Sequence, residues 1–563
     1  MVAASSDAGG SGSGGDLPVR QAAAVHFKNM VRGGWGRGDG PSSANDGGDD
    51  DDAAPTEFVV PDADRELIKN NLVSLMCTVP PALQSQCSES IALIAAVDFP
   101  RRWDNLLADL MAKFTDPNWN IVNGVLLTAN SILKRFRFVQ RSDALYADIL
   151  YVLQRIQGPL TQLFVSITAQ LDDTARTASS GDILGLTARL AALRSINRIF
   201  YSLNYQDLPE YFEDHMNEWM AGFARLLQYT NPNLVDEDEE MQPGEFLVTC
   251  VVTLRAKFPL MFSHTSHSLK YYCHDFFLIH ASLKNTHTGP IDNVQVSVVQ
   301  NLNLYGNKDE EPFIPFLPQF TTLVWNLLMT VTPHSKHDGL ATISIRFLSS
   351  LVGKLMHRHL FEGESTLREI FGRIVIPNLA IREIDEERFM DDPTEFILSD
   401  MESSDTESRR KCTQELLRAM CRQFESRTTS ICHEHVSQML QQFTTDLNQW
   451  KMKDVAIHLM LGIAIRAESA QHGVSQVNDG VNIMEFFSSQ ILTELRVSDM
   501  SVRPMVKATC IKFVSIFRNQ FTTEQFGVLI PLLISHLGSN DVVVHTYAAV
   551  GKYKKYIAHI VSR

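Results

Sequence analysis

Apolar residues recur at helical spacing along most of this chain. Such spacing runs from 83 to 97 and again from 103 to 114, which predicts two amphipathic helices joined by a tight corner. Pro100 suits the first turn of the second helix, where a missing N–H is harmless, and Asp98 can accept hydrogen bonds from the free amides of that turn. Trp103 is then expected one turn into the second helix, on its apolar face.

The same kind of corner returns further along the chain. Asp116-Pro117-Asn118-Trp119 and Asp207-Leu208-Pro209 each precede a new stretch of helical apolar spacing. No run of alternating polar and apolar residues is long enough to predict a sheet. Helix pairs joined by short corners are typical of HEAT repeats of roughly 40–47 residues. The sequence therefore predicts an all-α HEAT-repeat α-solenoid, a right-handed superhelical array of antiparallel helix pairs; separate helical bundles would need clearer linkers.

Interruptions of the helical pattern divide the chain into five segments. A low-complexity Gly/Ser/Ala segment comes first, and helical repeats follow in two blocks separated by an atypical insertion. A second, acidic insertion at 383–407 interrupts the later block, and we interpret it as a solvated loop or a docking site for basic partners. The five segments are 1–16, 17–243, 244–300, 301–549 and the divergent 550–563.

Composition limits the kinds of partner. The 563 residues are 44% hydrophobic, which is ample for a packed interior, and they carry a net charge of −15. That charge argues against direct nucleic-acid binding and favours basic protein partners. The eight cysteines form no Cys-x-x-Cys pair, which indicates reduced thiols in a cytosolic or nuclear protein. The most apolar run, 246–262, is interrupted by charges and a proline, so no membrane insertion is expected.

The sequence contains no recognisable catalytic device. Gly353-Lys354 and Gly551-Lys552 lack the Ser or Thr that would follow in a phosphate-binding loop. In Cys432-His433-Glu434-His435 the histidines are two residues apart, so on a helix they cannot easily share a metal ion, and we interpret them as surface histidines. Lys134–Arg137 is interpreted as a solvated helix end. We therefore expect no enzyme activity, no metal ion and no cofactor.

Asp98-Phe99-Pro100-x-x-Trp103-x-x-Leu106-Leu107 resembles the hallmark corner of the importin-β (karyopherin) superfamily. Within that superfamily, the chain is similar to the exportins that return importin-α to the cytoplasm. The stretches that carry this closer similarity lie at 19–29, 200–210, 405–410, 516–520 and 543–549. The resemblance therefore runs in register through most of the chain.

This resemblance implies a nuclear export receptor. Its relatives bind the small GTPase Ran in its GTP state together with importin-α, and they contact nuclear pore proteins while shuttling between nucleus and cytoplasm. GTP would be carried by Ran, and hydrolysis on Ran would release the cargo. The acidic insertion looks like a partner-binding insertion of the family. Its candidate partner-binding residues are Asp385, Glu386, Glu387, Asp391, Asp392, Glu395, Asp400, Glu402 and Asp405.

Three departures limit what the resemblance implies. Before Leu17 the family has further helical sequence where this chain has Gly, Ser and Ala, and the segment 244–300 matches little in the family. Beyond Ala549 the family continues with further repeats. We therefore expect a partial form that lacks the C-terminal arch and binds importin-α weakly. The alternative interpretation is a HEAT-repeat scaffold for another protein assembly.

Overall fold

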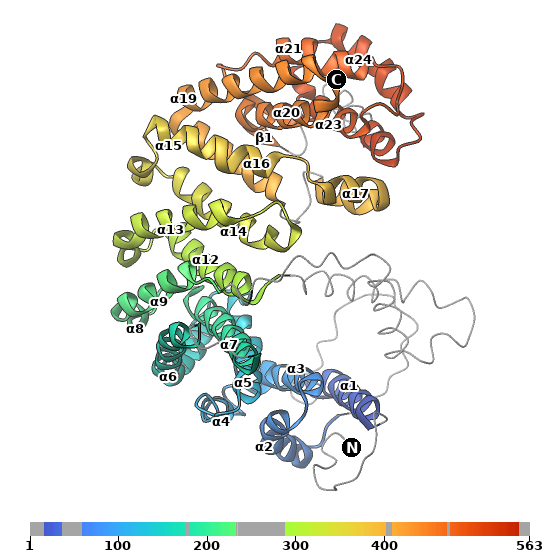
Figure 1. Ribbon diagram of the computed structural model, residues 1–563. Coiled ribbons are helices and arrows are strands. Elements are labelled where there is room, and N and C mark those ends of the chain that lie inside the picture. Colours follow the sequence, from blue (N-terminus) through green and yellow to red (C-terminus); the bar gives the residue numbers. More distant parts are fainter. Residues whose placement is uncertain are drawn as a thin grey trace, which may run out of the picture. The chain divides into compact units, whose positions relative to one another are not determined.

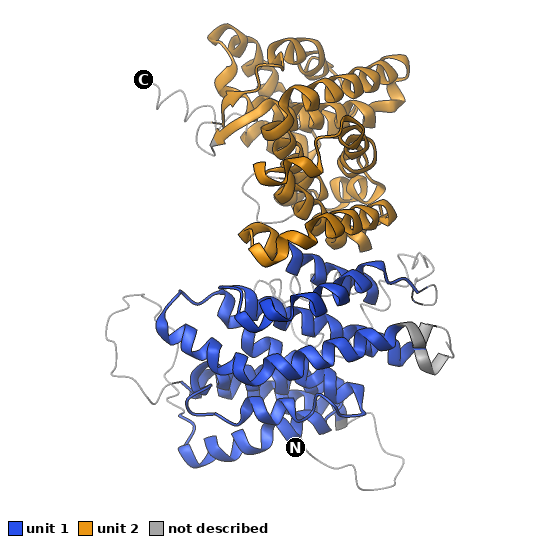
Figure 2. Cartoon of the chain, turned by 90° about the vertical axis from the view of Figure 1, so that its left-hand side faces the viewer, with its two compact units in different colours: residues 1–304 blue, residues 305–563 orange. Residues whose placement is uncertain are grey.

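A computed structural model describes residues 16–36, 59–175, 180–231, 234, 288–400, 408–469 and 473–550. The chain forms two compact units, residues 1–304 and 305–563 (Figure 2). Helices dominate both units (Figure 1). Within the described ranges no helix is long and apolar enough to cross a membrane. The six cysteines within these ranges are free thiols.

The N-terminal unit is built from eleven elements across the described residues. They are α1 (Asp16–Gly34), α2 (Asp62–Thr78), α3 (Pro81–Asp98), α4 (Leu106–Met111), α5 (Trp119–Leu133), η1 (Lys134–Arg137), α6 (Asp143–Ala175), α7 (Ser180–Asn204), α8 (Glu210–Asp214), α9 (Met216–Gln228) and α12 (Pro290–Lys308), the last of which runs across the unit boundary.

These helices pack in two layers. One layer stacks α1, α3, α5 and α7 in sequence order, and the other contains α2, α4, α6 and α9. The pairs α2–α3, α4–α5 and α6–α7 connect the layers (Figure 1). Each pair is one helical hairpin, so the packing follows the repeat that the apolar pattern predicts.

Bulky side chains from three helices fill the space between the layers. Phe164 on α6 stacks on Trp219 of α9 with ring centroids 4.3 Å apart, and Phe200 on α7 contacts the same indole at a tilt, with centroids 4.1 Å apart. Gly222 on α9 permits this approach, because a Cβ there would lie 2.3 Å from the Phe164 ring. All three rings are buried. The apolar faces predicted from sequence are therefore the faces that form the core.

The corner after α3 differs from the predicted geometry. Asp98 is the last residue of α3, and Pro100 follows a cis peptide bond in a turn. Because α4 begins only at Leu106, the prediction that Pro100 and Trp103 lie in the second helix is wrong. Proline is as compatible with a turn as with a first helical turn, so the sequence could not separate the two. Trp103 is nevertheless buried, with 2% of its surface exposed.

Asp98 is buried and forms ion pairs with basic side chains, which corrects its predicted role as a helix cap. Its carboxylate accepts a hydrogen bond from Trp35 Nε1 at 3.2 Å and lies 3.1 Å from Lys69 Nζ. Arg102 Nε lies 3.3 Å away on the solvent side. The carboxylate thus joins the end of α1 to α2 and α3, and both Asp98 and Lys69 are buried.

The two later corners share the sequence motif but have other roles. Asp116 accepts from the N–H of Asn118 at 3.0 Å, and Asn118 in turn caps α5. Asp207 accepts from the hydroxyl of Tyr146 at 2.8 Å at an exposed position. Asp116 lies inside the α4–α5 pair, whereas Asp98 lies between α3 and α4 and Asp207 lies between α7 and α8. The motifs therefore mark connections between helices without sharing one position in the repeat or one contact pattern.

The C-terminal unit continues with mostly helical elements. Across its described residues they are η4 (Glu311–Phe316), α13 (Leu317–Thr330), η5 (Ser335–His337), α14 (Asp338–Val352), η6 (Leu355–Leu360), α15 (Glu364–Glu369), η7 (Ile370–Val375), α16 (Ile376–Leu379), α17 (Glu383–Asp391), α18 (Pro393–Asp400), α19 (Arg409–Thr445), η8 (Leu447–Gln449), α20 (Trp450–Ala464), β1 (Ile465–Ser469), β2 (Gly473–Val477), α21 (Ile483–Phe486), η9 (Phe487–Ile491), α22 (Leu492–Leu495), α23 (Pro504–Ile516), η10 (Arg518–Gln520) and α24 (Thr523–His536).

A short β-hairpin is the one departure from helical structure among the described residues. β1 and β2 pair antiparallel, with Ile465 opposite Val477 and Ser469 opposite Gly473. β1 alternates only over the four residues Ile465–Glu468, and β2 does not alternate, so the sequence does not carry a strand signal in both halves of the hairpin. The hairpin connects α20 to α21 within a helical unit, so it adds a local strand pair to the predicted all-α class.

The structure also tests some predicted boundaries. α12 begins at Pro290, so the last residues of the segment predicted to be atypical, 290–300, are regular helix. The side-chain amide of Asn197 donates to Ser297 Oγ at 3.1 Å, which places α12 against α7. Thr522 and Gln525 form a capping box at the start of α24. Residues 1–15, 244–287 and 551–563 lie outside the described residues.

Candidate partner-binding site

The acidic insertion is helical where the sequence predicts a solvated loop. Residues 383–400 form α17 and α18, and Phe389 of one contacts Phe396 of the other edge to face, with centroids 5.1 Å apart. Asp392 caps α18, because its carboxylate accepts from the N–H of Glu395 at 2.9 Å. In α17 Phe389 is the one buried residue, so no apolar stripe was available to indicate a helix.

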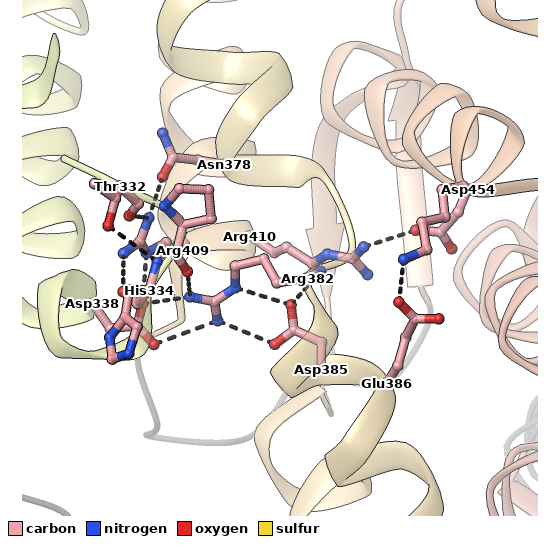
Figure 3. Close-up of polar contacts among 12 residues, drawn as sticks. Thr332, His334, Asp338, Asn378, Arg382, Asp385, Glu386, Arg409, Arg410 and Asp454 are labelled. Atoms are coloured by element: carbon pink, nitrogen blue, oxygen red, sulfur yellow. Dashed lines mark hydrogen bonds and ion pairs between the residues drawn. The ribbon is translucent and has the colours of Figure 1, made fainter. Parts of the chain in front are cut away.

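Arg382 and Asp385 begin α17 and attach it to α14. Asp385 accepts from the N–H of Arg382 at 3.0 Å, and its carboxylate accepts from Nε and Nη2 of Arg382 at 3.0 Å and 3.1 Å. Arg382 Nη1 also donates to Asp338 at 2.5 Å (Figure 3). Burial would raise the pKa of Asp385, but the hydrogen bonds and charge of Arg382 outweigh burial and lower that pKa.

Asp338 also binds the first residue of α19. Arg409 Nε donates to Asp338 Oδ1 at 2.6 Å, and its Nη groups donate to the carbonyl oxygens of Thr332 and His334 at 3.0 Å (Figure 3). Burial lowers the pKa of Arg409, so this buried guanidinium needs its full set of acceptors. Arg382, just before the acidic insertion, and Arg409, just after it, therefore both bind the carboxylate of Asp338.

Two further acidic residues pair with basic side chains that are distant in sequence. Glu386 contacts Lys451 of α20. Asp400 lies 2.8 Å from Lys512 Nζ of α23 and accepts from the Tyr547 hydroxyl. Burial would raise the pKa of Asp400, but the charge of Lys512 outweighs burial and lowers it. These acids anchor the insertion, which corrects their interpretation as solvated side chains.

A row of acidic side chains remains at the surface of α17. Glu383, Glu387 and Asp391 follow one another at four-residue intervals, so they share one face of the helix, and all three are exposed. We call this set the acidic row. Met390 beside it is 71% exposed, and Leu398 on α18 is 56% exposed. Negative charge next to apolar surface is suited to a basic amphipathic segment.

The structure therefore separates the nine candidate residues into groups. Asp385, Glu386 and Asp400 bind within the chain, whereas Glu387, Asp391 and Asp392 are exposed. Glu395 is half-buried, and Glu402 and Asp405 lie outside the described residues. A role of any of them in partner binding stays a prediction. Arg382 is only three residues from Asp385, but the partners of Glu386 and Asp400 lie between 65 and 147 residues away, so no local pattern could have identified those two contacts.

Lys134–Arg137 is a structural element, which corrects its interpretation as a solvated helix end. Phe136 is buried, and Arg135 donates to the carbonyl oxygens of Ala95 and Phe99 at 3.0 Å. Arg137 donates to the Arg198 carbonyl at 2.8 Å. Burial lowers the pKa of both guanidinium groups. Arg135 therefore satisfies carbonyl groups at the C-terminal end of α3, and Arg137 binds a carbonyl of α7.

In the histidine-rich stretch on α19, His433 is exposed, whereas Glu434 and His435 contact other residues of the chain. Glu434 forms a bidentate pair with Arg368 at 2.7 Å and 3.2 Å, and the His435 ring stacks on Phe371. Cys432 is buried. In the part of the chain that the structure describes, no three His, Cys, Asp or Glu side chains are placed to hold a metal ion.

His458 on α20 lies next to the anchored end of the insertion. Its Nε2 accepts from Arg410 at 3.2 Å, and its Nδ1 lies 2.9 Å from the Gln414 amide. The ring is 2% exposed, with Asp454 3.8 Å from Nε2. Burial, together with the charges of Arg410 and Lys512, holds the pKa of His458 well below its usual range. The imidazole is therefore neutral in the folded protein.

We expect the C-terminal unit to lose stability in mild acid. Below about pH 6.5 the unfolded chain protonates His458 and the folded chain does not, so the free energy of unfolding falls as pH falls. From pH 7 to 5.5 the loss should be about 1–2 kcal/mol. Urea unfolding of the wild type and His458→Gln tests this. A variant with the same pH slope as the wild type would show that another group is responsible.

The comparisons with known proteins agree with this architecture. A family model described as Cse1 matches residues 132–254 and 259–551, and one described as Importin-beta N-terminal domain matches 12–78. Exportin-2 of Pagrus major is 35% identical over 536 residues, covering 95% of this chain and 48% of that protein. Human Exportin-2 is 35% identical over 535 residues, with the same coverage. The chain thus spans about half the length of the curated relatives it matches.

A solved structure described as the exportin Cse1 in its cargo-free, cytoplasmic state superposes with a TM-score of 0.79. It is 29% identical and is matched over 99% of this chain and 52% of its own. Stacked helix pairs together with an importin-beta N-terminal domain define a karyopherin of the importin-β superfamily, and the predicted HEAT-repeat solenoid class is confirmed. More narrowly, the chain belongs to the Cse1 family.

Proposed function

We propose that this chain acts as an exportin-type nuclear export receptor that binds Ran in its GTP state together with importin-α. The observation that carries the proposal is the 35% identity to Exportin-2 over 95% of the chain. GTP belongs to Ran in this proposal, so the chain itself needs neither a cofactor nor catalysis. It would shuttle between nucleus and cytoplasm and contact nuclear pore proteins on the way.

The acidic row supports importin-α as the cargo. Exposed carboxylates at four-residue spacing attract a Lys/Arg-rich segment, and the attraction is screened as salt rises. The row is held in place because Arg382 and Lys451 fix the same helix from its other side through Asp385 and Glu386. A helix fixed in this way presents its charges without a cost in ordering on binding.

Nucleotide-dependent binding tests the function. Immobilised chain should retain Ran loaded with a non-hydrolysable GTP analogue and should not retain Ran loaded with GDP. Equal retention of both forms, or of neither, would contradict an export receptor. Retention of neither, in a chain whose helical content and thermal unfolding are intact, would favour the alternative of a HEAT-repeat scaffold for another assembly.

A charge reversal in the acidic row should weaken importin-α binding. Glu387→Lys is expected to lower the affinity about five- to tenfold at low ionic strength, and the difference should shrink in 0.5 M salt. Glu524→Lys is the matched control, since it makes the same charge change at an exposed helical position on α24. If both variants weakened binding equally, only the net charge of the chain would matter.

A further inference from the structure

Three arginines lie together towards the C-terminal end of α7. Arg194 and Arg198 are four residues apart on α7, so they share one face of the helix, and Arg194 is exposed. Arg137 of η1 joins them, because its guanidinium donates to the carbonyl oxygen of Arg198 at 2.8 Å and to Ser202 Oγ at 2.9 Å. We call Arg137, Arg194 and Arg198 the arginine cluster.

The positive charges of the arginine cluster are not balanced within the described residues. In these ranges neither Arg194 nor Arg198 forms an ion pair with a carboxylate. Partial desolvation by the neighbouring chain, and after it the charge of Arg198, lowers the pKa of Arg194. Burial lowers the pKa of Arg137, and the charge of Arg198 adds to this effect. An anion bound at the cluster would therefore relieve repulsion between like charges.

The helices beside the arginine cluster supply almost no negative charge. α5, which packs along α7, has no acidic residue in its sequence. α7 and α12 have one each, Asp182 and Asp292, and both belong to the first turn of their helix. The chain as a whole carries a net charge of −15, so this layer departs from the average composition. Such a local excess of positive charge attracts an acidic partner.

Aromatic side chains continue the same surface towards the end of α7. Arg137 lies over the Tyr201 ring, 4.7 Å from its centroid, and the rings of Tyr201 and Tyr205 are 5.7 Å apart. Tyr205 is 36% exposed, and Phe138, the residue after Arg137, is 82% exposed. Arginine and tyrosine are enriched among the residues that contribute most to protein–protein binding. We call the arginine cluster together with Tyr201, Tyr205 and Phe138 the arginine–tyrosine face.

We propose that the arginine–tyrosine face binds an acidic segment of another protein that also carries an apolar or aromatic side chain. The carboxylates of that segment would pair with Arg194 and Arg198, because guanidinium groups bind carboxylates in a planar, bidentate geometry. The apolar side chain would pack against Tyr205 and Phe138. A nucleic acid is the weaker candidate, because three cations are few for a polyanion and the net charge of −15 would repel it.

Fluorescence anisotropy of the full chain with a labelled synthetic peptide rich in Glu and Phe tests the proposal. The wild type should bind the peptide, more weakly as salt rises, and Arg194→Glu should lower the affinity at least tenfold. Arg373→Glu should leave the affinity within about twofold. Arg373 is the matched control because it is an exposed helical arginine in the other unit. A wild type that does not bind, or an Arg194→Glu variant that binds equally well, would overturn the proposal.

A second variant keeps the test valid if Arg194→Glu affects folding. Phe138→Ala removes a ring that is 82% exposed, so it should leave the fold intact and still weaken peptide binding at least threefold. Unlabelled single-stranded RNA should compete poorly with the peptide. RNA that binds more tightly than the peptide, and that Arg194→Glu releases, would overturn a protein partner in favour of a nucleic acid.

An acidic run of the chain itself is the remaining alternative occupant. Residues 236–240 read Asp-Glu-Asp-Glu-Glu and lie outside the described residues. A variant with Asn and Gln at these five positions should bind the peptide about as well as the wild type. Peptide binding that occurs only in this variant would show that the acidic run occupies the arginine–tyrosine face, which would overturn a partner supplied by another protein.

Discussion

Replacing Trp103 with alanine is expected to lower the free energy of unfolding of the N-terminal unit by about 3–5 kcal/mol. The indole is 2% exposed, between the end of α3 and the start of α4. In the described residues its Nε1 has no hydrogen-bond partner, so the loss is one of packing. Removing a buried indole leaves a cavity that the surrounding side chains fill only in part.

Thermal unfolding measures this effect. For a unit of this size the transition of the N-terminal unit should fall by roughly 10 °C, while that of the C-terminal unit stays in place. Phe138→Ala is the control, since Phe138 is 82% exposed and its removal should change stability by less than about 0.5 kcal/mol. A shift near zero for Trp103→Ala would mean that the corner is not packed as described.

Replacing Glu494 with leucine is expected to destabilise the C-terminal unit by about 3–5 kcal/mol. Glu494 is 2% exposed and lies between two cations, with Lys453 Nζ at 2.7 Å and Arg503 at 3.0 Å. Both cations also lie over the Phe443 ring, at 4.9 Å and 5.5 Å from its centroid. Without the carboxylate, two positive charges would remain in an apolar environment and repel each other.

A double variant separates the ion pair from side-chain volume. Lys453→Met combined with Glu494→Leu removes both buried charges, and Arg503, which is 16% exposed, can turn towards water. Most of the lost stability should therefore return, because well-packed apolar residues can replace a buried ion pair at little cost. Urea unfolding of the two variants tests this. A double variant no more stable than Glu494→Leu would show that packing, and not charge, determines the loss.

The sequence predicts the helical repeat because one apolar face per helix is enough to locate it. Leu106, Leu110 and Phe114 recur at helical spacing, and all three are buried. Trp103 belongs to the same apolar pattern, and it is buried as predicted, but it lies in a turn and not in a helix. Burial follows from the apolar pattern. The turn after Asp98 depends on contacts of the Asp98 carboxylate with Trp35 and Lys69, which the sequence does not display.

The candidate site was less predictable for a related reason. The acidic insertion could be found from its composition, but charge alone does not reveal which carboxylates face water. Asp385 and Asp400 bind Arg382 and Lys512, and the second of these partners is 112 residues away. The acidic row can be distinguished from the other acids of α17 only because the structure shows that Asp385 and Glu386 form ion pairs within the chain.

Cooperative binding is the property that most directly defines an importin-α export receptor. The affinity of the chain for Ran bearing a GTP analogue should be measured by titration calorimetry, without and with saturating importin-α. We expect the affinity for importin-α alone to be weak, as predicted above. At saturation importin-α should nevertheless tighten Ran binding at least tenfold, a coupling of about 1.4 kcal/mol or more, and Ran should tighten importin-α binding by the same factor. Affinities that do not depend on the second ligand, or that are equal for Ran-GTP and Ran-GDP, would contradict this function.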